Sequence, residues 1–291
     1  MGYLTNNASR TPHTVAAQLQ GIGLPAQPDD IVSSPQAAVV LLAGLVPAGS
    51  LVLVVGGDGL TSEVERAGFR ITRSADDAPA AVVQGFAPSV AWTDLAEAAF
   101  ALKGGDSGIP WVATNTDWTI PQARGTAPGN GTLVSAVHTA VGRLPVVAGK
   151  PERAIFDAAV ARFGAVTPLF IGDRLDTDIL GAVRAGMDSA LVLTGIDGPK
   201  QLLAAAHDSR PTYVLADLRE LAQPYPVIRD ETDAAGDRRV RAGDAVVLHR
   251  GSSLTLEAAG SAIDRLRAAA AAVWGAGVPI YALDVAPELY S

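Results

Sequence analysis

Gly172-Asp173-Arg174-Leu175-Asp176-Thr177-Asp178 gathers three carboxylates behind the apolar run 167–171 and ahead of an Ala/Gly-rich segment. This order predicts a buried strand, a polar loop and then a helix. Ligands of open α/β sheets bind at the carboxyl ends of the strands, and Mg²⁺ prefers carboxylate oxygens. The stretch therefore suggests a Mg²⁺ site and phosphate chemistry. An ordinary helix start is the alternative, because Asp is common at N-caps and in first turns.

The composition excludes several kinds of site. The chain has 291 residues, is 48% hydrophobic and carries a net charge of −8. This negative charge argues against nucleic acid or an anionic membrane as partner, since both favour a basic face. The absence of cysteine excludes disulfides, thiolate metal sites and cysteine nucleophiles. The four histidines are widely spaced, which argues against a zinc site.

The N-terminal residues lack the basic and apolar regions of a secretory signal. The apolar stretch 37–55 is interrupted by Gly44, Pro47 and Gly49, so it predicts helix, turn and strand rather than a membrane span. Together with the lack of cysteine, these features lead us to expect a cytoplasmic protein.

Strands and helices are expected to alternate through most of the chain, which favours parallel sheets with crossover helices. The predicted strands are 3–4, 50–56, 80–83, 110–113, 145–148, 168–171, 189–193 and 213–215. The predicted helices are 11–20, 34–43, 60–67, 93–102, 131–141, 151–163 (with Pro151 at its first position), 177–185 and 218–221.

The pattern changes after Leu221, where prolines precede the highly charged segment 229–241. β-like runs at 245–249 and 253–257, a helix at 261–274 and a last strand near 279–283 follow. We therefore expect a small ββαβ domain over residues 225–291.

Three segments repeat one arrangement, in which a short apolar strand leads into a polar loop and then a helix. The loops are Thr5–Arg10, Gly149–Pro151 and Gly172–Asp178. Placed at one sheet edge, they would supply a hydroxyl with backbone amides, an ammonium and carboxylates, which together bind a phosphate and its metal. Taken alone, the loop of Thr5 is more often a turn or helix cap and the loop of Lys150 more often an exposed turn, so the weight lies in their occurrence together and in this order.

With these motifs in this order, the chain resembles the haloacid dehalogenase (HAD) superfamily, specifically its NagD-like phosphatases of subfamily IIA. Residues 4–12, 149–151 and 172–179 resemble the family's second, third and fourth motifs. Residues 112–117 and 128–131 are similar to its large cap. The resemblance covers about residues 2–222, and residues 225–291 add a narrower resemblance to glycerol-3-phosphate phosphatases with a small extra domain.

The resemblance implies an α/β fold with three parts. These are a Rossmann-like HAD core that lacks its first strand (1–46 and 144–222), an inserted α/β type-C2 cap (47–143) and the small C-terminal domain (225–291). Members of this family commonly pair through their caps, so a homodimer is expected.

The resemblance also assigns roles around the phosphate. Thr5 would hydrogen-bond the transferring phosphoryl group, helped by the amide of Asn6, and Lys150 would neutralise charge. Asn115 and Asp117, with the glycine turn 129–131, would belong to the cap that closes over the substrate; a plain turn and helix cap are the alternative.

For the metal, Asp173 would bind Mg²⁺, and Asp178 would support it through water or from outside the coordination sphere. Asp176 is assigned no role, because solvation alone explains it.

The family's first motif, an apolar strand ending in Asp-x-Asp-Gly, does not occur in this sequence. Its first Asp attacks phosphorus and its second is the general acid and base. Neither Asp76-Asp77 nor Gly57-Asp58-Gly59 is in position to replace it. Losing about five buried side chains of a central strand would cost about 8–15 kcal/mol, comparable with a domain's whole stability. We expect either a misassigned start or fragment, or a genuine non-catalytic derivative.

The sequence therefore predicts a Mg²⁺-dependent phosphatase for a small phosphorylated metabolite, such as glycerol 3-phosphate or a sugar or polyol phosphate. The chain by itself is expected to be inactive. A phosphate-binding or regulatory protein that lost the chemistry is one alternative. A dinucleotide-binding protein built on the glycines at 56–59 is another, although the full G-x-G-x-x-G fingerprint is absent.

Overall fold

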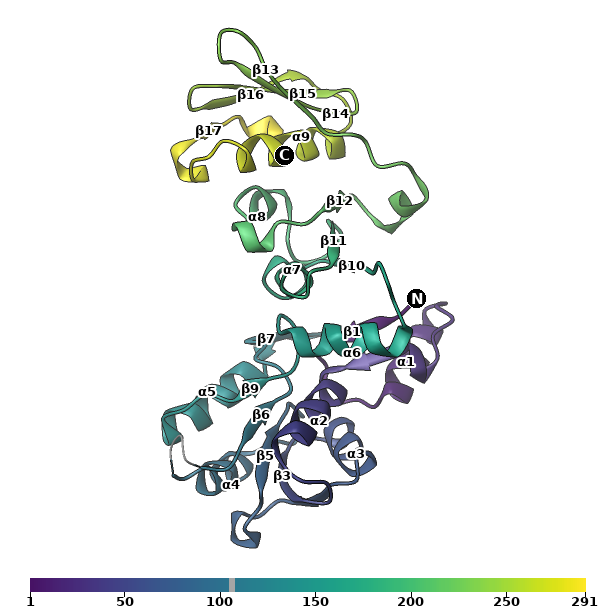
Figure 1. Cartoon of the computed structure of the whole chain (residues 1–291), viewed down its shortest axis with the longest axis vertical. Helices are drawn as coiled ribbons and strands as arrows, with labels where there is room; N and C mark the ends of the chain where they lie inside the picture. Colours follow the sequence, from purple (N-terminus) through teal and green to yellow (C-terminus); the bar gives the residue numbers. More distant parts are fainter. Residues whose placement is uncertain (105–107) are drawn as a thin grey trace. The chain divides into compact units, whose positions relative to one another are not determined.

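The computed structural model describes residues 1–104 and 108–291. Contacts divide the chain into two compact units, residues 1–166 and residues 167–291, and each is described here by itself (Figure 1). Both units contain parallel sheets with connecting helices, so the predicted α/β class is confirmed. The predicted boundaries of core, cap and C-terminal domain remain predictions.

The first unit begins with a two-stranded parallel sheet of β1 and β2. The elements are β1 (Tyr3–Thr5), α1 (Pro12–Gly21), η1 (Pro28–Asp30), β2 (Ile31–Ser33) and α2 (Ser34–Leu45). α1 begins as predicted: the Thr11 hydroxyl accepts a hydrogen bond from the Thr14 N–H, and Pro12 occupies the first turn. β2 was not predicted, because a strand of three residues has too few positions for a period-two pattern.

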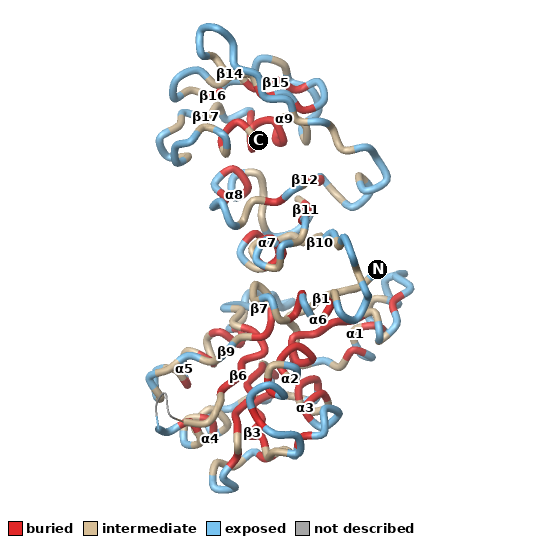
Figure 2. Tube along the Cα trace, viewed as in Figure 1, coloured by how far each residue is buried: buried red, intermediate tan, exposed pale blue. Residues whose placement is uncertain are grey.

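A five-stranded parallel sheet with the order β4-β3-β5-β6-β9 follows in the same unit. Its strands are β3 (Leu51–Val55), β4 (Arg70–Thr72), β5 (Ala81–Gln84), β6 (Trp111–Ala113) and β9 (Val146–Val147). The accompanying helices are α3 (Asp58–Arg66), η2 (Ala75–Asp77), α4 (Trp92–Ala101) and α5 (Asn130–Val141). Strands β3, β5 and β6 are almost wholly buried (Figure 2), which explains why their sequences read as continuous apolar runs.

Further elements of the first unit differ from the predictions, among them β4, which was not predicted. An antiparallel hairpin, β7 (Thr119–Gln122) with β8 (Gly125–Pro128), lies between β6 and α5 and was not predicted. A helix that starts at Pro151 was predicted, but α6 spans Arg153–Phe163 and starts two residues later. The Glu152 N–H instead donates to the Gly149 carbonyl, which closes a turn before the helix begins.

The second unit opens with a three-stranded parallel sheet, β10 (Leu169–Gly172), β11 (Asp188–Val192) and β12 (Tyr213–Leu215), in that order. The predicted helix 177–185 is wrong in its first turns: a π-helical segment, η4 (Leu175–Ile179), leads into α7 (Leu180–Arg184). Short helices α8 (Pro199–Leu203), η5 (His207–Ser209) and η6 (Leu218–Ala222) complete this part.

The C-terminal part contains more strands than the predicted ββαβ order. Two strands, β13 (Arg229–Thr232) and β14 (Arg238–Ala242), precede β15 (Ala245–Arg250) and β16 (Ser253–Ala258). Then come α9 (Ala262–Trp274), η7 (Ile280–Ala282), β17 (Asp284–Val285) and η8 (Pro287–Leu289). The last predicted strand, 279–283, is wrong, because most of it is the helical turn η7 and the strand lies after it.

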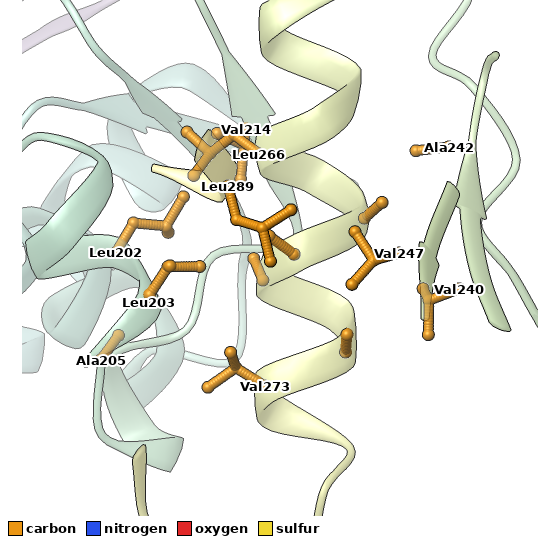
Figure 3. Close-up of a cluster of buried hydrophobic side chains, with 14 of the residues drawn as sticks. Leu202, Leu203, Ala205, Val214, Val240, Ala242, Val247, Leu266, Val273 and Leu289 are labelled. Carbon is orange, nitrogen blue, oxygen red and sulfur yellow. The ribbon is translucent and has the colours of Figure 1, made fainter. Parts of the chain in front are cut away.

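Helix α9 lies in one hydrophobic cluster with elements on both of its sides (Figure 3). Val240 and Val247 approach it from the C-terminal sheet, and Leu202 and Val214 approach it from α8 and β12. A helix that packs against two layers must be apolar around most of its surface. This requirement explains the run of alanines in α9 and joins residues 225–291 to the three-stranded sheet through a shared core.

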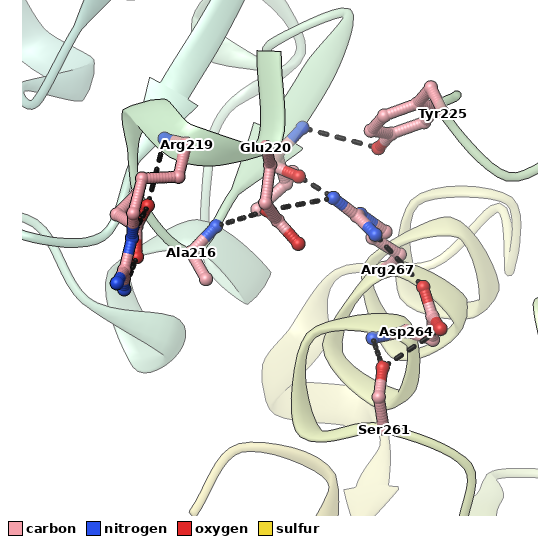
Figure 4. Close-up of polar contacts among 9 residues, drawn as sticks. Ala216, Arg219, Glu220, Tyr225, Ser261, Asp264 and Arg267 are labelled. Carbon is pink, nitrogen blue, oxygen red and sulfur yellow. Dashed lines mark hydrogen bonds and ion pairs between the residues drawn. The ribbon is translucent and has the colours of Figure 1, made fainter. Parts of the chain in front are cut away.

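A buried arginine also links α9 to this sheet (Figure 4). Arg267 is 6% exposed, and its Nε donates to the Val214 carbonyl at 2.9 Å. The guanidinium also pairs with Glu220 and Asp264 and lies over the ring of Tyr225. The charge is thus buried with its hydrogen-bond partners supplied, as a buried ion requires.

Among the described residues, no helix combines the length and the apolar character needed to cross a membrane.

Candidate active site

The loop after β1 is shaped by its own polar side chains. The Thr5 hydroxyl accepts the Asn7 N–H at 3.1 Å. The Asn7 side-chain oxygen in turn accepts the N–H groups of Ser9 and Arg10. These bonds fold the polar loop back on itself at the carboxyl end of the strand, where ligands of parallel sheets bind.

The side chain of Asn6 connects this loop to the loop that carries Lys150. Its Oδ1 accepts the Lys150 N–H at 2.8 Å, and its Nδ2 donates to the Lys150 carbonyl at 3.0 Å. The same Nδ2 donates to Asp117 Oδ1 at 3.0 Å. Gly149 has no room for a Cβ, which would collide with Asn6 and with the backbone of Thr114. The glycine of Gly149-Lys150-Pro151 is therefore required for this close approach.

Asn115 holds the backbone of the same loop from a buried position. It is 4% exposed, and its Nδ2 donates to the Asn6 carbonyl at 2.7 Å. Its Oδ1 accepts the Asp117 N–H, and its own carbonyl accepts from the side chain of Asn130. The hydroxyl of Ser34 also donates to the Asn6 carbonyl. Asn115 thus ties together loops that are far apart in the sequence.

The second unit contains the carboxylate stretch, in which Asp178 organises the loop. Asp178 is 3% exposed, and its Oδ2 accepts the N–H groups of Asp173 and Arg174 at 3.1 and 3.2 Å. A Cβ on Gly172 would collide with the Asp178 side chain, so glycine is needed at the end of β10. These contacts fix the backbone on either side of the Asp173 carboxylate.

Asp176, by contrast, is an exposed carboxylate whose partner is Arg174. Both of its oxygens accept from the guanidinium, at 2.9 and 2.7 Å. Hydrogen bonds from Arg174 lower the pKa of Asp176 below its usual range, and burial opposes this shift. Asp176 is thus an exposed carboxylate in an ion pair with its neighbour Arg174.

The donor set of this loop fits Mg²⁺ in its chemistry but supplies only part of a coordination shell. Carboxylate oxygens are hard donors of the kind that Mg²⁺ prefers. Within the described ranges, however, no three His, Cys, Asp or Glu residues are grouped so that they could hold a metal ion. Asp173 Oδ2 accepts the Ile196 N–H at 3.0 Å, so the neighbouring loop orients this carboxylate.

The structure brings together the five predicted residues of the first unit, namely Thr5, Asn6, Asn115, Asp117 and Lys150. Asp173 and Asp178 lie together in the second unit. The sequence did not point to Asp197, whose carboxylate bonds to the same loop. The signal available was its position shortly after β11, the strand beside β10, at the same end of the sheet.

Two family models match the chain. One, described as HAD-hydrolase-like, matches residues 147–221, and the other, described as haloacid dehalogenase-like hydrolase, matches residues 1–70. These ranges contain the loops of Thr5 and Asp173.

Among characterised proteins, a D-glycerol 3-phosphate phosphatase of Mycobacterium tuberculosis is 43% identical over 94% of this chain and 77% of the relative. An acid sugar phosphatase of Staphylococcus aureus is 33% identical over 75% of this chain and 82% of the relative.

Solved structures agree with these relatives. A glycerol phosphate phosphatase of M. tuberculosis in complex with magnesium aligns with a TM-score of 0.84 and 40% identity, over 98% of this chain and 83% of that one. A p-nitrophenyl phosphatase from Archaeoglobus fulgidus aligns at 0.67 and 27% identity, over 76% and 84%. The motifs, the fold and these similarities lead to one conclusion: the chain belongs to the haloacid dehalogenase-like hydrolases, among the phosphatases of subfamily IIA.

Proposed function

We propose that the residues of this chain serve Mg²⁺-dependent hydrolysis of a small phosphomonoester, either glycerol 3-phosphate or a related sugar or polyol phosphate. One observation carries the proposal: the side chain of Asn6, the residue after Thr5, hydrogen-bonds to both the N–H and the carbonyl of Lys150. The relatives named as D-glycerol 3-phosphate phosphatase and acid sugar phosphatase support the substrate class.

In this proposal the first unit positions the phosphate and neutralises its charge. Thr5 and the amide of Asn6 bind the phosphoryl oxygens, and the Lys150 ammonium offsets the negative charge that develops on them. Phosphoryl transfer depends mainly on such positioning and electrostatic stabilisation. Asn115 and Asp117 would lie near the substrate, and their hydrogen bonds hold the Asn6 loop in place.

Asp173 and Asp178 form the protein's part of the metal site. Asp173 would offer Oδ1, while Asp178 keeps the loop in shape through its bonds to two backbone N–H groups. When bound, Mg²⁺ would polarise the phosphoryl oxygens. The magnesium complex of the similar M. tuberculosis phosphatase supports this choice of metal.

The Asp-x-Asp-Gly motif, which carries the nucleophile in the resembled family, does not occur in this sequence. In the family's chemistry an Asp of the first motif attacks phosphorus, the bond to the substrate oxygen breaks, and water then hydrolyses the aspartyl phosphate. We therefore propose that this chain alone does not turn over.

A substrate panel tests the proposal. The chain is extended at its N-terminus by an apolar strand that ends in Asp-x-Asp-Gly, and phosphate release is measured from glycerol 3-phosphate, sugar phosphates and a nucleotide. We expect release from the polyol and sugar phosphates that EDTA abolishes and that Lys150→Ala reduces by at least about a hundredfold. EDTA-resistant release, or release unaffected by Lys150→Ala, would contradict the proposal.

A non-catalytic phosphate-binding or regulatory protein is the second candidate, favoured by the missing Asp-x-Asp-Gly motif. The DNA upstream of the Met1 codon separates the two: an in-frame Asp-x-Asp-Gly favours the phosphatase, and a stop codon favours the regulatory protein. A cytoplasmic location and a homodimer through residues 47–143 remain part of the proposal.

A further inference from the structure

The loop that follows β11, residues 194–197, is bonded to the Asp173 loop in both directions. The Ile196 N–H donates to Asp173 Oδ2 at 3.0 Å, and the Asp197 N–H donates to the Asp173 carbonyl at 3.1 Å. In return, the Leu175 N–H donates to Asp197 Oδ2 at 2.6 Å. Three hydrogen bonds thus connect the two loops, and two of them end on Asp173 itself.

The close approach of these loops depends on Gly195. A Cβ at this position would overlap the Asp173 carboxylate, with Oδ2, Cγ and Cβ all inside van der Waals contact. Any other residue would have to displace either the loop or the Asp173 side chain. The need for glycine at position 195 is independent of the hydrogen bonds. It also indicates that this loop sets the position of the Asp173 carboxylate.

Buried side chains anchor both ends of this arrangement. Leu175, whose N–H Asp197 accepts, is 8% exposed. Helix α8 begins directly after the loop, and its Leu202 is fully buried in the cluster around α9. The loop itself is exposed at residues 194–196, but the elements to which it is bonded and connected are anchored in the core.

We propose that Asp197 is a positioning residue for the metal site. By holding the Leu175 N–H, it keeps Ile196 in place to bind Asp173 Oδ2, and this leaves Oδ1 oriented for the cation. The inference rests on the proposed function, because it presumes that Asp173 binds the metal. Groups that orient a metal ligand from outside the coordination sphere commonly change metal affinity by about 10–100-fold.

Mn²⁺ binding to the chain extended by a strand that ends in Asp-x-Asp-Gly, measured by electron paramagnetic resonance of the free ion, tests this role without relying on catalysis. Mn²⁺ accepts the same oxygen donors as Mg²⁺ and can be counted directly. The variants are Asp197→Ala, which loses the acceptor, Asp197→Asn, which retains an oxygen for the Leu175 N–H, and Gly195→Ala. Asp208→Ala is the matched control, because it removes an exposed carboxylate of the same unit whose hydrogen bond is to its neighbour Ser209.

We expect Asp197→Ala and Gly195→Ala to weaken Mn²⁺ binding by at least about tenfold, with Asp197→Asn within about threefold of the extended chain without substitutions and Asp208→Ala unchanged. Urea unfolding midpoints for the same variants show whether the fold is retained. Hydrogen exchange at the Leu175 amide should be faster in Asp197→Ala and close to normal in Asp197→Asn.

Asp173→Asn separates failure of this inference from failure of the proposed function. If Asp173→Asn removes Mn²⁺ binding while folded Asp197→Ala binds normally, the role of Asp197 is wrong and the metal site stands. If Asp173→Asn binds Mn²⁺ normally, or if the extended chain without substitutions takes up no Mn²⁺, the metal site and the role of Asp197 both fail.

Discussion

The side chain of Asn6 bonds to both polar backbone groups of Lys150, accepting its N–H at 2.8 Å and donating to its carbonyl at 3.0 Å. The two residues are 144 positions apart in the sequence. A side chain that satisfies the N–H and the carbonyl of one distant residue fixes the path of that residue's loop. The position of the Lys150 ammonium thus depends on an amide at the end of β1.

Replacing Asn6 should therefore disturb Lys150. Asn6→Ala removes the bonds to the Lys150 backbone and to Asp117, and we expect it to lower the free energy of unfolding by about 2–3 kcal/mol. Amide exchange at Lys150 should become faster. Urea unfolding and NMR exchange measure the two effects, with Gln18→Ala, an exposed amide, as control. Unchanged exchange at Lys150 would show that Asn6 does not hold it.

The Arg267 network predicts that the C-terminal part is not separable from the sheet of β10, β11 and β12. Arg267→Ala leaves Glu220 and Asp264 without their buried cation and should cost about 3–5 kcal/mol. Arg265→Ala, in the same helix, should cost less than about 1 kcal/mol. Chemical unfolding checks both values. Equal effects of the two substitutions would contradict the account of α9.

The buried alanines of α9 should not tolerate replacement by larger side chains. Ala269 is fully buried, and Ala269→Leu would force extra methyl groups between two packed layers, at a cost of about 1–3 kcal/mol. Ala262→Leu, at the exposed start of the helix, should change stability by less than about 0.5 kcal/mol. Thermal unfolding of both variants tells them apart. A neutral Ala269→Leu would mean that the helix does not pack on both sides.

Because of Glu63, we expect the free energy of unfolding to depend on pH. Burial raises the pKa of Glu63 above its ordinary value, although Arg66 and Gln36 oppose this shift. Because the raised pKa belongs to the folded state, the stabilising contribution is complete below the ordinary pKa and is lost as pH rises through the folded value. Glu63→Gln should therefore stabilise the protein more at pH 7 than at pH 4.

Unfolding in urea at both pH values measures this difference, with Glu65→Gln on the exposed side of α3 as control. A gain for Glu63→Gln that is the same at pH 4 and pH 7, or larger at pH 4, would contradict the assignment.

The sequence predicted elements that have a clear apolar run or a clear end signal. β3, β5 and β6 are buried on both faces and appear as apolar runs, and α5 is capped by Gly142, which has a left-handed φ of 75°. β14 was missed because Arg239 and Arg241 alternate with the buried Val240 and Ala242 inside a charged segment. Its period-two pattern was present but was obscured by the charge.

The site was predictable as a set of residue types but not as a set of contacts. Asp173 and Lys150 follow apolar runs in the sequence, whereas the bonds of Asn6 span more than a hundred residues. Asp197 lacks a motif of its own, because its role comes from the pairing of β10 with β11. Sequence position alone could not reveal which carboxylate supports which loop.

The most direct test of the proposed phosphatase is hydrolysis of p-nitrophenyl phosphate with Mg²⁺, measured for the chain as it stands and for the chain extended by a strand that ends in Asp-x-Asp-Gly. We expect turnover by the extended chain, abolished by EDTA, and at least about a thousandfold less by the unextended chain. Hydrolysis by the unextended chain at a comparable rate would contradict the proposal that this chain alone does not turn over.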